Sequence, residues 1–205
     1  MTQEERVSRA EVRTQAQRER ILAAAEACFT ERGFHAASMA HIAETAEMSP
    51  GLIYRYFDSK SAIILAIIER QLELARAEIA NLHDSVDLPH GIWETTLPRE
   101  ARSDGRMNPA LYVEMSAEAC HDPEIGAAVR EADLILRTEF ARWLGRSREQ
   151  GGLGLTPAKA RAAALMIQCL VDGLRVRQLR EPDVDRALVK RALEEFLAPM
   201  LRPRD

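Results

Sequence analysis

The sequence predicts an all-α protein of about nine helices, and three observations support this prediction. Apolar residues make up 46% of the chain but aromatic residues only 5%, and alanine and leucine, both strong helix formers, are plentiful. No run of alternating β-branched residues is long enough to form a sheet. A capping residue followed by proline marks helix starts at Ser49-Pro50, Asn108-Pro109, Asp122-Pro123 and Thr156-Pro157.

The first part of the chain predicts a polar arm followed by a helix. Residues 1–12 are polar and alternate in charge, so we expect a flexible arm there. A helix is expected at about 13–32, ended by Gly33, because glycine suits the left-handed backbone at helix C-termini. Its buried face is predicted to consist of Ile21, Ala25, Cys28 and Phe29.

Residues 38–60 predict two short helices that are joined by a tight turn and run into a third. Ser38 is expected to cap the first, whose apolar stripe contains Ile42, Ala43 and Ala46. Ser49 lies where its side-chain oxygen can cap the second helix. Pro50 takes the first position of that helix, where no amide donor is missed.

The second short helix has one apolar side and one polar side. A helix of this length is not stable alone in water, so Ile53 and Phe57 are expected to pack it on its neighbours. The other side suits phosphate oxygens and base edges more than a protein core, since it carries Gly51, Tyr54, Arg55 and Tyr56. Helix-turn-helix modules place their second helix in the major groove of DNA in this way.

The run from Ile42 to Lys60 resembles the signature of the TetR/AcrR family of transcriptional regulators, and residues 20–34 are similar to that family's first helix. The resemblance covers about residues 14–65, roughly a quarter of the chain. Glu47 departs from it, because the family usually has glycine at this position of the turn. If the position needs a positive φ, the glutamate costs about 1 kcal/mol.

The resemblance implies a set of DNA contacts in this chain. Arg55 is the best candidate for a base contact, since its fork matches guanine, whereas the hydroxyls of Tyr54 and Tyr56 would donate to phosphates. Ala40 and Leu52 can meet thymine methyl groups. The full predicted set is Ser38, Ala40, Ser49, Pro50, Gly51, Leu52, Tyr54, Arg55, Tyr56 and Lys60.

The net charge of the N-terminal part does little to support a DNA-binding function. Residues 1–60 carry eight basic and nine acidic side chains, a net charge of −1 within a chain of net charge −4. The basic domain typical of nucleic-acid binders is therefore absent. We expect binding to depend on a few well-placed donors, with modest nonspecific affinity.

The rest of the chain predicts further helices. A helix that begins at Asp58 or Ser59 is expected to end near Leu82. Proline and glycine residues obscure the pattern over 83–107, and a short helix at 89–97 is a guess. Later helices are expected at 109–120, 123–150, 157–180 and 183–201. The predicted domains are a flexible arm (1–12), a helix-turn-helix DNA-binding domain (13–60) and a helical ligand-binding and dimerisation domain (61–205).

The helix at 157–180 is apolar over most of its circumference and must be covered on every side. A second copy of the chain is an economical cover, and the broad apolar face of the last helix would join the same interface. The resemblance implies the same homodimer. The predicted interface residues are Leu165, Leu170, Leu174, Leu188, Leu193, Phe196 and Leu197.

The resemblance also implies a small-molecule pocket in the second half of the chain. Candidate lining residues combine methionine, aromatic and a few polar groups, which suits an apolar or amphipathic effector. They are Trp93, Met107, Tyr112, Met115, Ser116, Phe140, Trp143, Met166, Gln168 and Cys169, each of which is also a plain core candidate.

Other functional classes find little support. The longest apolar run, Ala62–Ile68, is too short to span a membrane, and the N-terminus has no secretory signal. Three widely spaced cysteines argue against disulfides, so a cytoplasmic location is expected. No metal-ligand spacing, cofactor motif or catalytic group is evident. The adjacent Cys120, His121 and Asp122 do not face one another on a helix.

Three functions remain open at this point. The leading hypothesis is a dimeric repressor that a small ligand releases from a palindromic operator of double-stranded DNA. The alternatives are a redox-sensing regulator that acts through Cys120 or Cys169, and a helical enzyme or binding module with a vestigial DNA-binding head.

Overall fold

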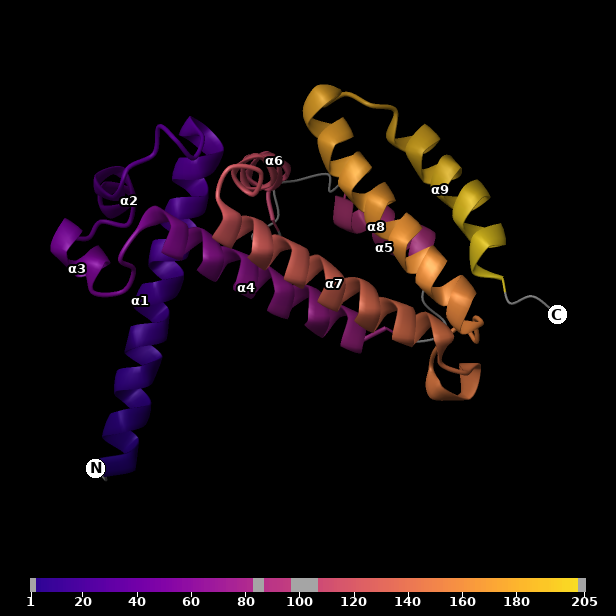
Figure 1. Ribbon diagram of the computed structural model, residues 1–205, viewed down its shortest axis with the longest axis horizontal. Coiled ribbons are helices and arrows are strands. Elements are labelled where there is room, and N and C mark those ends of the chain that lie inside the picture. The colour runs from indigo at the N-terminus through magenta and orange to yellow at the C-terminus, as the bar shows by residue number, and fades with distance from the viewer. Residues whose placement is uncertain (1–2, 83–86, 97–106, 203–205) are drawn as a thin grey trace. The chain divides into compact units, whose positions relative to one another are not determined.

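The computed structural model of the chain describes residues 3–82, 87–96 and 107–202, and within them all side chains except those of residues 3–10 and 93–95. Every regular element in this part of the chain is helical (Figure 1), which confirms the predicted all-α class. None of the described helices is long and apolar enough to cross a membrane.

The helices follow the predicted order. They are α1 (Gln3–Arg32), α2 (Met39–Thr45), α3 (Pro50–Tyr54), α4 (Lys60–Ala80), α5 (Leu88–Thr96), α6 (Pro109–Glu118), α7 (Pro123–Gly145), α8 (Pro157–Arg180) and α9 (Arg186–Leu201), with a 3-10 turn at Arg148–Gln150.

The chain forms two compact units. The first consists of Met1–Glu69 with Val113–Ala128, and the second of Arg70–Tyr112 with Val129–Asp205. Helices α4, α6 and α7 each contribute residues to both units. The functional domains 13–60 and 61–205 stay predictions, since a compact unit is not the same thing as a functional domain.

Helix α1 supplies the buried base of the first unit. Its predicted face is buried, since the four side chains Ile21, Ala25, Cys28 and Phe29 are at most 3% exposed. The predicted arm was wrong, because α1 begins at Gln3 and not near residue 13. Glutamate and arginine make up half of residues 3–12, and glycine and proline are absent from them, so local propensity favours continuing the helix.

The turn between α2 and α3 contains a strained glutamate. Glu47 has φ 50, so the position does need a positive φ, and glycine is usual there in the resembling family. Its carboxylate lies 2.9 Å from Nη2 of Arg20. Both side chains are largely exposed, so this ion pair contributes about 0–1 kcal/mol and offsets the backbone strain only in part.

Replacing Glu47 tests this strain. The free energy of unfolding of Glu47→Gly should exceed that of Glu47→Ala by about 1 kcal/mol. Both variants lose the ion pair, but only the alanine variant keeps the strained φ. Urea denaturation of the two variants measures the difference. Equal stabilities would show that the turn carries no strain.

The second unit is built on α5, α7, α8 and α9. One core cluster joins Leu88, Trp143, Leu144, Leu155 and three alanines of α8. A second joins Ile92, Ile167, Leu174, Leu193 and Leu197, and α5 packs on both α8 and α9 there. The predicted interface positions Leu174, Leu193 and Leu197 therefore need correcting, because they are buried within a single chain.

The end of α7 and the start of α9 differ from prediction. Helix α7 stops at Gly145 and not near residue 150, because the chain folds back there and the Gly154 amide donates to the Arg146 carbonyl at 2.7 Å. A Cβ at Gly152 would lie 2.5 Å from two backbone oxygens, so only glycine fits. Helix α9 begins at Arg186 instead of near residue 183, because Asp185 caps it by accepting from two backbone amides.

Candidate nucleic-acid interface

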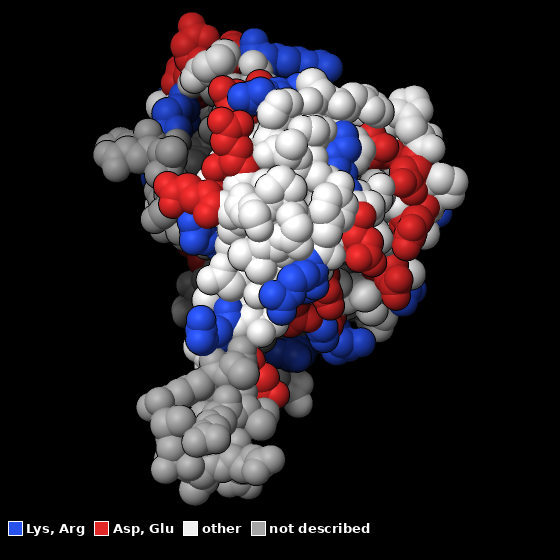
Figure 2. Space-filling view, turned by 90° about the vertical axis from the view of Figure 1, so that its left-hand side faces the viewer, with Lys and Arg blue, Asp and Glu red and all other residues white. Residues whose placement is uncertain are grey.

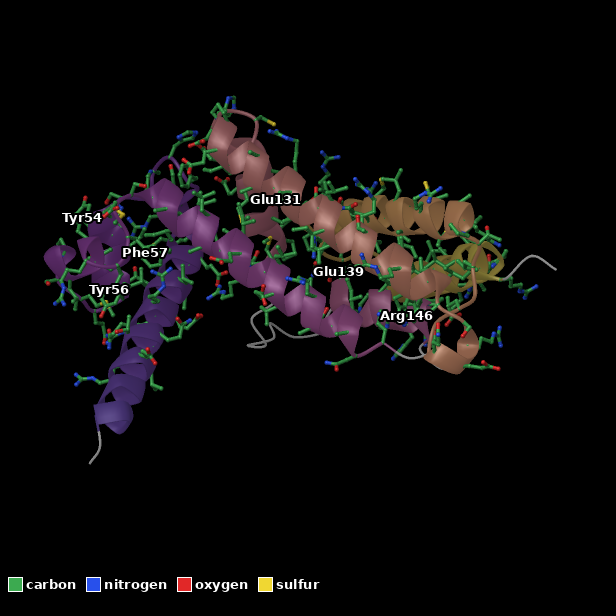
Figure 3. The ribbon with its side chains drawn as sticks, turned by 60° about the horizontal axis from the view of Figure 1, so that its bottom comes forward. Tyr54, Tyr56, Phe57, Glu131, Glu139 and Arg146 are labelled. Carbon is green, nitrogen blue, oxygen red and sulfur yellow. The ribbon has the colours of Figure 1, made fainter. Side chains whose placement is uncertain are left out.

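Helix α3 presents one face and buries the other, as predicted. Ser49 Oγ accepts from the Leu52 amide at 3.3 Å and caps the helix ahead of Pro50. Ile53 is fully buried and Phe57 is 4% exposed, whereas Tyr54 is 51% exposed. Figure 3 shows Tyr54 at the outer edge of the first unit and Phe57 further inside.

Arg18 of α1 holds the end of α3, which the sequence did not predict. Its guanidinium lies 4.5 Å from the centre of the Phe57 ring, an attractive cation–π geometry, and Nη1 donates to the Tyr56 carbonyl at 3.4 Å. No local pattern marks Arg18, because its two partners lie about forty residues further along the chain. The position of α3 therefore depends on α1.

Helix α2 brings a second set of predicted contacts to the same unit. Ser38 Oγ accepts from the His41 amide at 3.2 Å, which confirms that it caps α2. A serine hydroxyl that accepts one hydrogen bond still has its own proton to donate, so Ser38 and Ser49 remain suited to phosphate oxygens. Ala40 is exposed on α2.

Lys60 is engaged inside the protein. Its ammonium donates to the carbonyl oxygens of Phe34 at 2.8 Å, Ala37 at 2.7 Å and His35 at 3.5 Å, and it lies 4.6 Å from the Phe34 ring centre. An ammonium has three donors, and these carbonyls occupy them. Lys60 is therefore no longer a candidate for the predicted phosphate contact. The carbonyls of the segment that links α1 to α2 need a donor, and Lys60 supplies it.

Three of the six described basic side chains of the first unit are engaged by groups distant in the sequence. Arg20 is paired with Glu47, and Arg18 and Lys60 hold the backbone. Arg55 is exposed and has no partner among the described residues. Figure 2, which views the side that carries α2 and α3, shows single basic side chains scattered among acidic ones around a broad uncharged area. This pattern favours specific donors over a general electrostatic attraction.

Gly51 has open space beside it. A Cβ built at Gly51 would meet nothing within 4 Å among the described atoms, and the residue is exposed. The fold itself does not require glycine at this position. A missing side chain on an exposed helix start instead suits the close approach of an external surface.

The predicted pocket residues do not form one lining. Trp143 is a core residue whose indole N–H donates to the carbonyls of Leu82 at 3.2 Å and Gly151 at 3.0 Å. Met166, Ser116 and Cys169 are exposed, which corrects their expected burial. The side chain of Trp93 lies outside the described residues. Met107 and Phe140 are half-buried, and Met115 is buried in the first unit.

Tyr112 and Gln168 lie in a polar cluster of the second unit, which we define as Tyr112, Asp133, Arg137, Gln168, Asp172 and Arg175. Arg137 donates to Gln168 Oε1 at 3.1 Å, and the Arg175 guanidinium lies 5.0 Å from the Tyr112 ring centre. Burial of the carboxyl group raises the pKa of Asp133, and the nearby Asp172 carboxylate raises it further. The rest of the residue is exposed. Nothing in the sequence pattern predicted the four charged members.

The described residues contain no clustered metal ligands, and their cysteines are unpaired. No group of three or more histidine, cysteine, aspartate or glutamate side chains there is placed to hold a metal ion. All three cysteines are free thiols, Cys28 in the core and Cys120 and Cys169 on the surface.

A capped two-helix unit that presents tyrosines, an arginine and a bare helix start defines a helix-turn-helix DNA-binding protein. Residues 21–67 match the family of bacterial regulatory proteins described as the tetR family, and residues 89–202 match the C-terminal domain of BetI-type transcriptional repressors. The chain belongs to the TetR family and is a DNA-binding transcriptional regulator.

Individual relatives agree with this assignment. The chain is 34% identical over 143 residues to the HTH-type transcriptional regulator UidR of Escherichia coli K12, covering 69% of this chain and 71% of UidR. The structure of Salmonella enterica GusR matches with a TM-score of 0.67 at 27% identity, over 89% of this chain and 96% of that one. The reduced form of E. coli NemR matches with a TM-score of 0.71 over 92% of this chain and all of NemR, although its 21% identity supports the fold alone.

Arg55 is expected to be needed for operator binding. Arg55→Ala should weaken binding to the cognate operator by at least about tenfold, since one bidentate base contact carries about 1–3 kcal/mol of discrimination. Fluorescence anisotropy with labelled duplex DNA measures this loss. Arg148→Ala, in the exposed 3-10 turn of the second unit, is the matched control and should bind normally. Unchanged affinity of Arg55→Ala would remove the residue from the interface.

Gly51 is expected to be required by DNA and not by the fold. Gly51→Ala should leave the melting temperature unchanged or slightly raised, because alanine favours helix, yet it should weaken operator binding several-fold. Thermal denaturation and operator titration of the same preparation separate the two effects. Full operator affinity in the alanine variant would show that the backbone does not approach DNA closely there.

Proposed function

We propose that the protein is a homodimeric repressor that binds a palindromic operator and is released from it by a small amphipathic ligand. The observation that carries the proposal is the buried Ile53 and Phe57 beneath an exposed Tyr54 and Arg55. The repressor sense follows the BetI-type match of the C-terminal half. We propose no enzymatic activity, and a cytoplasmic site of action.

The proposed dimer interface lies on α8 and α9. In a single chain Leu165 is 46% exposed, Met166 56%, Leu188 58% and Phe196 76%. Large apolar side chains this exposed are typical of surfaces that meet a partner. Leu165, Leu188 and Phe196 therefore remain from the predicted interface set. Met166 joins them as a residue first assigned to the pocket. Leu170 of α8 is half-buried.

The proposed ligand acts through the second unit. Its polar cluster and the neighbouring half-buried Phe140 would together suit a ligand with one polar and one apolar part. Binding would favour a conformer whose two α3 helices are wrongly spaced for DNA, and the operator would then be released by a shift of population. The ligand has to bind that conformer more tightly than the DNA-binding one.

Selection of bound sequences from random duplex DNA tests the proposal. Wild-type protein should recover a palindrome whose half-sites lie about one helical turn, 34–36 Å, apart, because a two-fold dimer places its two reading helices at that spacing. Phe196→Glu should give a folded monomer by light scattering that recovers no palindrome. The conservative Phe196→Leu is the control. Recovery of no sequence, or of a single asymmetric site, would contradict the proposal.

A redox-sensing regulator is the second candidate. Cys120 and Cys169 are both exposed, so oxidants can reach them. Cys120 Sγ lies 3.4 Å from the carbonyl oxygen of Ser116, four residues earlier in the chain. Cys120 and Cys169 do not form a disulfide with each other. A protein with serine at both positions that keeps its full regulatory response would remove this candidate.

A further inference from the structure

The segment that links α1 to α2 is held by a carboxylate from a distant helix. Helix α1 ends at Gly33, whose φ is +76, and the next amide has no helical acceptor. That amide, Phe34 N–H, donates to Glu114 Oε2 of α6 at 2.8 Å, across 80 residues of sequence. A Cβ at Gly33 would lie 3.2 Å from the same oxygen, so the glycine also gives the carboxylate room.

A second carboxylate of α6 contacts the next residue. Glu118 is one helical turn beyond Glu114 and is only 9% exposed. Its Oε2 lies 3.5 Å from Nε2 of His35. The His35 side chain is 82% exposed, so solvent screens this contact and it adds little to the hydrogen bond of Glu114.

Helix α4 holds the same link from its acceptor side. Lys60 donates to the carbonyls of Phe34, His35 and Ala37, so its ammonium and the Glu114 carboxylate satisfy opposite kinds of backbone group. Ser38, the cap of α2, follows directly. The start of α2, and with it the turn to α3, is thus set by groups from α4 and α6.

We infer that Glu114 is a positioning residue for the DNA-reading helices, and that its hydrogen bond to Phe34 N–H sets where α2 and α3 lie. This inference rests on the proposed function, since it names a residue that positions the same DNA site. Glu114 itself does not contact DNA.

Two replacements of Glu114 separate its hydrogen bond from its bulk. Glu114→Met removes the acceptor and should lower operator affinity about tenfold, because the Phe34 amide is left unpaired in a partly buried place. Glu114→Gln keeps an acceptor oxygen and should stay within about threefold of wild type. Glu131→Met is the control, since Glu131 is an exposed carboxylate of α7 (Figure 3).

The position of the DNA-reading helices can be measured without DNA. With serine at Cys120 and Cys169, spin labels at residue 31 of both protomers report the distance between the two heads by pulsed electron resonance. The distance distribution should broaden in Glu114→Met and match wild type in Glu114→Gln, at equal dimer content. A residue that only stabilised the fold would lower the melting temperature without changing this distribution.

The outcomes distinguish the inference from the proposed function. Normal affinity and an unchanged distance distribution in Glu114→Met would overturn the inference and leave the repressor intact. No operator recovered by wild type would overturn the proposed function, while the distance measurement would still test Glu114. If Glu114→Met does not fold, hydrogen exchange of the Phe34 amide in wild type decides, because rapid exchange would show that the bond does not hold the link.

Discussion

The burial of Ile53 and Phe57 is the constraint on which the DNA-reading unit depends. Helix α3 has five residues, too few to stabilise itself, so its orientation is determined by what lies beneath it. Once those two side chains are buried, helical geometry turns Tyr54 and Arg55 outward. The cation–π contact of Arg18 with Phe57 then fixes the end of the helix to α1. Reading DNA is thus a consequence of packing two hydrophobic residues.

Three of the six described cations of the first unit are engaged within it. Lys60 donates to carbonyls of the link between α1 and α2, Arg18 donates to one at the end of α3, and Arg20 pairs with the strained Glu47. The three that remain, Arg13, Arg32 and Arg55, are exposed. Such a protein gains less affinity from counterion release than a basic DNA-binding domain does, and more of its affinity has to come from individual side chains.

The link between α1 and α2 is held from two sides. Lys60 of α4 donates to its carbonyls, and Glu114 of α6 accepts from its Phe34 amide. A link held in this way has few conformations of its own, so these two side chains determine where α2 begins.

The sequence by itself determined the helical class, most helix boundaries, the caps Ser38 and Ser49 and the exposed face of α3. These features depend on residues within about four positions of one another, which a local pattern records. Only the tertiary structure decided that Lys60 binds carbonyls, that Leu193 and Leu197 are core while Phe196 is exposed, and that Glu114 holds Phe34. In each of these cases the partner lies far away in the chain, and no spacing along the sequence shows which distant group a side chain will meet.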